Sequence, residues 1–352
     1  MARSISGTSF CFCFLFAFHI LAGNGGAEAA LPDGSADTNV VPAGHFYLYR
    51  GSAGSQPLSL ELGLAAGVRF DRMRWSIAGS PSGQHPNILS ELTWSDVLSH
   101  QLSLSGRTRV GSHFYGRGQV NFAWIESGSL QDSDYHGDNR TQEYSRSVCE
   151  TNGDHLWDVT AGIGYPFTFP RHRTFISPMA GISFHRQSFR ITNGQQVISD
   201  DPDGNTPAVG PLSSSLSSLY TATWRNLWIG CDLRHEMASS FKAPPPMVWE
   251  LSLKYFVVAD YSAEADWNLR DNLQHPVSFE HDAKGNGFSA QILWLIRLAR
   301  HMDMSLALNY IQLKTDAGKD KVYKADGTFL TTRLNEVLWH SNSVMLGLVY
   351  RF

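Results

Sequence analysis

Two aspartates, Asp132 and Asp134, are the residues of this 352-residue chain whose types and spacing most directly suggest chemistry. Carboxylates two positions apart on a β-strand point to the same face. Their mutual repulsion raises one of the two pKa values, so the pair can hold a proton and a water molecule. Such a pair is suited to proton transfer.

The same stretch of chain has two other interpretations. Because Asp, Asn, Ser and Gly dominate turns, Asp132–Arg140 can be a solvated loop tip without a function. Gly137 and Glu143, together with the two aspartates, also fall at positions one, three, six and twelve of an EF-hand-like calcium loop. His136 breaks the fifth position of that loop, and strands rather than helices are expected on either side.

The last nine residues predict the element that organises the rest of the chain. Apolar residues take every second position from Val344 to Phe352, which is the period of a β-strand. Outer-membrane barrels end on such a strand, which pairs with the first strand and leaves no unpaired edge in lipid. Phe352 resembles the terminal signal that the barrel assembly machinery binds, so that machinery is an expected partner.

Alternating apolar residues recur along the chain and predict about ten strands. About five long polar connections, among them 131–153, 192–215 and 315–332, alternate with about four short turns. A barrel with long loops outside and short periplasmic turns sorts its connections in this way. We therefore predict an all-β, transmembrane, antiparallel up-and-down barrel. The expected strands are 58–70, 88–109, 114–131, 157–167, 175–191, 216–234, 247–264, 288–296, 302–310 and 344–352.

Composition agrees with a barrel in the bacterial outer membrane. Charged residues make up 17% of the chain, below the roughly 25% of typical soluble domains. No stretch after residue 30 approaches the roughly 20 apolar residues that a spanning helix needs. The net charge of −4 gives no support to nucleic-acid binding, which normally requires a basic face.

The N-terminus has the features of a secretory signal peptide. Arg3 precedes an apolar run from Phe10 to Ala22, and Ala27-Glu28-Ala29 forms a cleavage site. Of the cysteines that remain after cleavage, Cys149 falls near a predicted loop and Cys231 inside a predicted strand, so we expect no bridge. The predicted regions are a signal peptide (1–29), an extended lead-in (30–57) and the barrel (58–352).

Tryptophans fall mostly near predicted strand ends, where the aromatic girdles of barrels contact the membrane interface. These positions suit the lipid boundary, and aromatic residues in strands are also ordinary core residues. These tryptophans are Trp75, Trp94, Trp124, Trp157, Trp224, Trp249, Trp294 and Trp339.

The motif around the aspartates resembles the omptins, a family of outer-membrane endoproteases. Leu89-Ser90-Glu91-Leu92-Thr93-Trp94, followed by Gly128 and Asp132-Ser133-Asp134-Tyr135, is similar to the omptin succession L-S-E-L-x-W … G-x-x-x-D-x-D-[WY]. Pro178–Gly181 and Ser188–Arg190 are similar to the strand after the second omptin loop. The resemblance is remote outside Ile88–Tyr135.

The resemblance implies a ten-stranded barrel with an active-site groove at its extracellular mouth. In omptins an aspartate pair faces an Asp-His pair across the groove, and water between the pairs cleaves peptides beside basic residues. By this match Asp132 and Asp134 take the positions of the aspartate pair. The resemblance also implies a peptide or protein substrate and a surface that binds lipopolysaccharide, and no cofactor is expected.

The opposite half of the groove departs from the omptin pattern. The D-x-H of the family falls in 262–269, where Glu264-x-Asp266 or Asp266-x-Asn268 can occupy its place without an imidazole. His275 and His281 follow in the same region, and their spacing does not require either to return to it. Because a missing general base lowers the rate about 10²–10⁴-fold, the sequence leaves open an endopeptidase and a barrel that only binds. A host-contacting adhesin and a small pore are further alternatives, and the narrow lumen of ten strands disfavours the pore.

Overall fold

The computed structural model describes residues 58–169, 173–202, 204, 206–237 and 247–352. The predicted signal peptide and lead-in, the turn Ala243–Pro246 and most of the turn Pro170–Arg173 lie outside these residues. Within the described ranges, no helix is both long and apolar enough to cross a membrane.

Fourteen strand segments form one antiparallel sheet. A single-turn 3-10 helix, η1 (Asp138–Arg140), joins two of them. The strands are β1 (Ser59–Ile77), β2 (Ser90–Val110), β3 (Phe114–Gly137), β4 (Thr141–Thr151), β5 (His155–Gly164), β6 (Phe167–Phe169), β7 (Thr174–Ser199), β8 (Gly210–Pro211), β9 (Ser218–Glu236), β10 (Met247–Asp266), β11 (Phe279–Ala299), β12 (Met302–Thr315), β13 (Gly318–Tyr323) and β14 (Phe329–Arg351).

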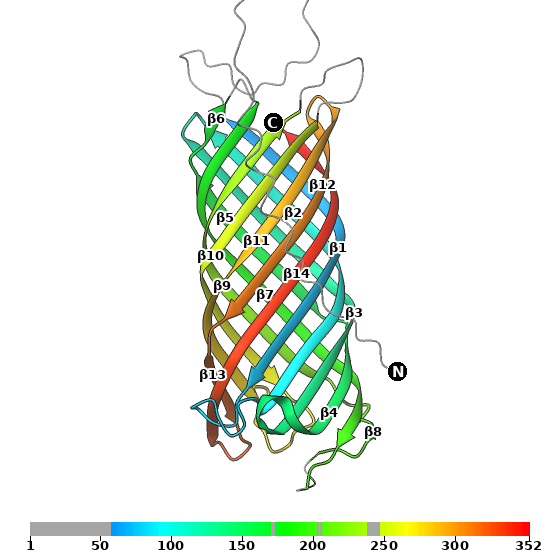
Figure 1. Cartoon of the computed structure of the whole chain (residues 1–352). Coiled ribbons are helices and arrows are strands. Elements are labelled where there is room, and N and C mark those ends of the chain that lie inside the picture. Colours follow the sequence, from blue (N-terminus) through cyan, green and yellow to red (C-terminus); the bar gives the residue numbers. More distant parts are fainter. Residues whose placement is uncertain (1–57, 170–172, 203, 205, 238–246) are drawn as a thin grey trace, which may run out of the picture. The chain divides into compact units, whose positions relative to one another are not determined.

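These segments occupy ten positions around a closed barrel (Figure 1). β4 and β5 both pair with β3 and β7 and share one position. β12 and β13 likewise share the position between β11 and β14. The short strands β6 and β8 each pair with β7 and add no position to the ring. The predicted fold class and the predicted number of strands are confirmed.

The C-terminal strand closes the barrel, as its alternation predicts. β14 pairs with β1 over its length, with Leu348 opposite Leu64 and Val344 opposite Val68. Leu346 and Tyr350 face outward and are 60% and 47% exposed. Such outward apolar side chains form the lipid-facing surface of a barrel. Closure of the sheet leaves no backbone N–H or C=O group without a hydrogen bond in the lipid.

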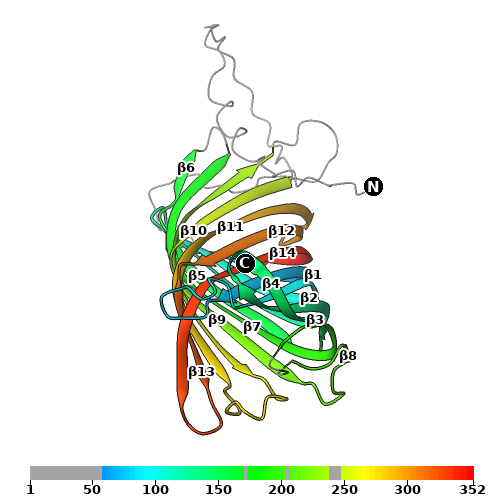
Figure 2. The same cartoon turned by 60° about the horizontal axis from the view of Figure 1, so that its bottom comes forward.

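Two of the predicted long loops, 131–153 and 315–332, are instead mostly continued strand, and a third, 192–215, is strand in part. β3 and β4 fill most of 131–153, β7 extends to Ser199 within 192–215, and β13 and the start of β14 lie within 315–332. Above the lipid, water contacts the outer face, so the apolar alternation that marks a strand is lost while backbone pairing continues. Figure 2 brings forward this end of the barrel, which carries β4, β8 and β13.

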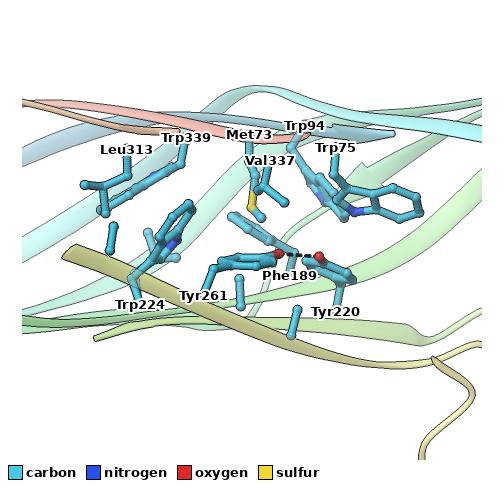
Figure 3. Close-up of a cluster of buried hydrophobic side chains, with 14 of the residues drawn as sticks. Met73, Trp75, Trp94, Phe189, Tyr220, Trp224, Tyr261, Leu313, Val337 and Trp339 are labelled. Carbon is cyan, nitrogen blue, oxygen red and sulfur yellow. Dashed lines mark hydrogen bonds between the residues drawn. The ribbon is translucent and has the colours of Figure 1, made fainter. Parts of the chain in front are cut away.

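Four of the tryptophans whose positions suit the lipid boundary lie inside the barrel instead. Trp75, Trp94, Trp224 and Trp339 are at most 3% exposed. They alternate with outward residues and fill an interior that ten strands leave wide enough for side chains. Trp124, which is 47% exposed, does face outward. We call the resulting plug the aromatic layer. It is made of Phe279 and of seven residues labelled in Figure 3, which are Trp75, Trp94, Phe189, Tyr220, Trp224, Tyr261 and Trp339.

Ring contacts and one polar link hold the aromatic layer together. Trp94 packs on Tyr220 with ring centroids 5.0 Å apart, and Trp224 packs on Tyr261 at 4.5 Å. The hydroxyl oxygens of Tyr220 and Tyr261 lie 2.5 Å apart, shown by the dashed line in Figure 3. The layer therefore separates the mouth above it from the lumen below.

Below the aromatic layer the lumen is filled by paired charges. Arg69 binds Asp71 at 2.7 Å and Asp158 at 2.6 Å, and the Trp339 indole donates to Asp71 at 2.8 Å. A polar cavity of about 90 Å³ remains beside Arg69. Cys149 and Cys231 are free, as predicted.

We expect the refolded barrel to show no steady conductance in planar lipid bilayers, because the aromatic layer and the charge cluster leave no continuous aqueous path. Single-channel recording beside an open porin of known conductance is the measurement. A steady open channel in the wild-type barrel would contradict this account of the lumen.

Candidate functional site at the extracellular mouth

Asp132 and Asp134 lie on the inner face of β3, beyond the lipid-facing part of the barrel. Their cross-strand neighbours on β2 are Leu92, which is buried in the core, and Ser90. Asp132 is eight positions beyond Trp124, the last outward aromatic residue of β3. At about 3.3 Å per residue and a tilt of about 40°, this places the pair roughly 20 Å above that residue along the barrel axis.

The electrostatic environment keeps this pair from ionising fully. Burial raises the pKa of Asp132 well above its ordinary value, and the charge of Asp134 raises it further. Burial also raises the pKa of Asp134. Hydrogen bonding by Ser90 and the charge of Arg270 lower both pKa values without reversing the rise. The pair therefore tends to hold a proton, as the spacing of the two carboxylates predicts.

An Asp-His pair is present on the loop between β10 and β11. Nδ1 of His275 lies 2.6 Å from Oδ1 of Asp266, and the two side chains are 37% and 33% exposed. The hydrogen bond and the charge of Asp266 raise the pKa of His275, and a hydrogen bond to the backbone of Arg270 adds to this rise. Turn hydrogen bonds from the Arg270 N–H to the Trp267 carbonyl (2.9 Å) and from the Leu273 N–H to the Arg270 carbonyl (2.8 Å) bring His275 back to Asp266.

The two pairs come from opposite sides of the mouth. In the order of the ring, β3 and β11 are five of ten positions apart. Arg270 belongs to the same loop as His275, and its charge acts on both Asp132 and Asp134. The loop therefore reaches across the mouth, with the Arg270 backbone at the imidazole and its guanidinium group near the carboxyls.

Glu264 does not belong to the mouth, contrary to one of our two alignments of the motif. On β10 the inward positions are Tyr261, Ala263 and Ala265, each at most 4% exposed. Glu264 alternates with them and is exposed on the outer face. Asp266, the last residue of β10, has the same parity as Glu264, and it gains an imidazole through the loop that follows the strand rather than from position 268.

Asn268 and His281 have structural contacts instead. Asn268 accepts the Ser217 N–H at 2.9 Å and donates to the Ser215 carbonyl at 2.8 Å, which ties two neighbouring loops together. His281 lies in the aromatic layer, where Nδ1 is 3.0 Å from the Tyr220 hydroxyl. Its Nε2 is 3.2 Å from Asp320. A histidine that is 1% exposed has no access to a substrate at the mouth.

The calcium-loop interpretation is wrong. Asp132 and Asp134 are on β3, and Glu143 is on β4, where it binds Arg146. A paired hairpin cannot wrap the twelve-residue loop around an ion. Among the residues that the structure describes, no group of three or more His, Cys, Asp or Glu side chains could hold a metal ion.

Sequence reasoning missed Arg270 and Tyr144 as parts of the mouth. Tyr144 is half-buried, and burial together with the charges of Asp134 and Asp201 raises its pKa to about 12. Neither residue lies in the aspartate motif, and no periodicity places a loop arginine opposite a strand. The one signal in the sequence that could have indicated Arg270 is its position between Asp266 and His275.

Comparison with known proteins identifies the family. The model described as "Pom: Protochlamydia outer membrane protein" matches residues 63–352. The chain belongs to this family. Its predicted location in the bacterial outer membrane is thereby confirmed. No curated protein matches the sequence significantly.

Solved structures of outer-membrane barrels are similar to this family member. The outer membrane protease OmpT from Escherichia coli is similar with a TM-score of 0.70 and 12% identity, over 86% of this chain and 99% of that one. The translocator domain of the autotransporter NalP from Neisseria meningitidis matches with a TM-score of 0.34 and 9% identity, over 83% and 88% of the two chains. At this identity the likeness to OmpT shows a shared barrel fold.

Replacing Asp132 with Asn should raise the free energy of unfolding at neutral pH and leave it unchanged in acid. Asp132 has a folded-state pKa above its unfolded value of about 3.9, so the wild-type barrel loses stability as pH rises from there through the folded pKa. Asn does not titrate and escapes this loss.

Urea unfolding of the refolded barrel at several pH values measures the difference. The exposed Asp316→Asn variant is the matched control. A gain from Asp132→Asn that is the same at every pH would contradict the assigned environment.

Proposed function

We propose that this barrel is a surface endopeptidase whose water nucleophile is held between Asp132–Asp134 and Asp266–His275. The observation that carries the proposal is the 2.6 Å Asp266–His275 contact on the loop whose Arg270 charge acts on the aspartate pair. The omptin-like motif and the OmpT-like fold support the same reaction class. Residues 262–269 lack the histidine of the omptin D-x-H motif. In this proposal His275, on the loop between β10 and β11, serves as the base instead.

Each pair has a role that follows from its surroundings. His275 takes a proton from water as that water attacks the peptide carbonyl, and Asp266 fixes its tautomer and stabilises the imidazolium. The aspartate pair holds a proton at the mouth, so one carboxyl can donate a hydrogen bond to the oxyanion that develops. Together the two pairs supply a base, an acid and a place for water.

The position of the site decides where its substrate comes from. The mouth lies above the lipid-facing wall, and the aromatic layer closes it from below. A peptide can therefore enter only from outside the cell, as an extended segment laid across the opening. The substrate class is a surface-accessible peptide or protein segment.

Removing the proposed base or the aspartate pair should abolish most of the activity. His275→Asn, Asp132→Asn and Asp134→Asn should each lower kcat about 10²–10⁴-fold, because each removes proton transfer or a group in direct contact with the reacting atoms. Cleavage of quenched fluorescent peptides with paired basic residues, by barrel refolded with lipopolysaccharide, is the assay. Asp316→Asn serves as the control, and activity that survives in all three variants, or a folded wild type without turnover, would refute the proposal.

Arg270→Gln should move the alkaline side of the pH–rate profile, where the pair loses its proton, to higher pH. The guanidinium lowers the pKa of both aspartates, so its loss raises both, and the pair deprotonates at higher pH. The control is Arg146→Gln, whose side chain binds Glu143. A profile unchanged by Arg270→Gln would show that this arginine does not act on the pair.

A further inference from the structure

A third ionisable group, His136, stands beside the aspartate pair without a role in the reaction described so far. It follows Asp134 by two positions on β3, which puts both side chains on one face of the strand. It is exposed, and no hydrogen bond or ion pair assigned within the described ranges uses its ring nitrogens. The imidazole is thus accessible to a substrate in the mouth.

A bulge in β4 fixes the direction of this histidine. Asp134 pairs with Ser145 and Tyr135 pairs with Glu143, so Tyr144 is an extra residue without a cross-strand partner. Bulges re-aim side chains, and here the Tyr144 ring stacks on His136 with centroids 3.9 Å apart and planes at 17°.

Tyr144 in turn lies on the side of the aspartates. Asp134 and Asp132 are among the charges that act on its hydroxyl, and the Tyr144 carbonyl accepts the Asp200 N–H at 2.8 Å. The backbone of this tyrosine is therefore anchored to the next loop while its ring supports the imidazole. His136 is held next to Asp134 by packing rather than left as a freely rotating surface side chain.

The mouth therefore presents an imidazole on each side. His275 comes from the loop between β10 and β11, and His136 comes from β3, at the opposite part of the ring. Peptide hydrolysis needs one group that removes a proton from water and another that delivers a proton to the departing nitrogen, because an amide anion is a poor leaving group. Two imidazoles that flank the scissile bond match these two needs.

We propose that His136 is the acid that protonates the leaving amine, a role that rests on the proposed endopeptidase function. Water forms the new C–O bond as its proton passes to His275. The C–N bond then breaks as the His136 imidazolium gives its proton to the nitrogen. The carboxylic acid product ionises, His275 releases its proton to solvent and His136 recovers one from solvent. Both imidazoles are thereby restored, and the products are a carboxylate and an amine.

The test compares an amide with an ester that carry the same acyl peptide. A nitrophenyl ester releases a stabilised phenolate that needs no proton, whereas the amide does need one. His136→Asn should lower kcat/KM for the amide about 10²–10³-fold and that for the ester less than about threefold, because only amide cleavage uses the acid. His275→Asn should slow both substrates, because both need the base.

Two further variants separate chemistry from structure. Tyr144→Leu removes the stacked ring and should lower amide cleavage about tenfold, with little effect on the ester, since the imidazole remains but is less well held. His113→Asn, in the turn at the opposite end of the barrel, should change neither rate. Circular dichroism and the urea midpoint verify that every variant is folded.

Every result bears on the proposal. Equal losses for amide and ester in His136→Asn, or no loss for either, would overturn the role of His136 while leaving the endopeptidase intact. Absence of hydrolysis of both substrates by the folded wild type would overturn the endopeptidase and, with it, the acid.

Discussion

Closure of the sheet through the pairing of β1 with β14 is the constraint on which the other features depend. In lipid an unpaired strand edge would leave a row of backbone groups without hydrogen bonds, and the register from Glu61–Arg351 to Ile77–Leu334 removes that edge. Closure also fixes the ring order, so β3 and β11 stand on opposite sides of the barrel. The aspartate pair on β3 and the loop that leads into β11, distant in sequence, are on opposite sides of the mouth for this reason.

A closed ring of ten strands creates an interior that must be filled, and its filling defines the site. Arg69 neutralises Asp71 and Asp158 in the lower part; a buried charge without such partners would cost several kcal/mol. The aromatic layer fills the upper part and forms the floor of the mouth. In the proposed function the reaction is thereby confined to the outside of the cell, and the lumen serves as support rather than as a path.

The sequence predicted the features that depend on a strict period of two. Lipid-facing alternation predicted the barrel and its closing strand, whereas Asp132 and Asp134 were found from the aspartate motif. Where water contacts the outer face of the barrel, apolar and polar residues no longer alternate along the strands. The extended β3–β4 hairpin was mistaken for a loop for this reason. The Asp266–His275 contact depends on a loop that folds back over nine positions, and the inward turn of Tyr144 depends on a bulge. Neither geometry has a signature in local spacing.

A double-mutant cycle between Asp132 and His275 tests most directly whether the two pairs form one site. Peptide cleavage is measured for wild type, Asp132→Asn, His275→Asn and the double variant, all refolded in the same way. Groups that act together in one reaction show strongly non-additive losses. The account predicts that the double variant is about as slow as the slower single variant. Losses that multiply would contradict it, because they would mean that the two residues act independently.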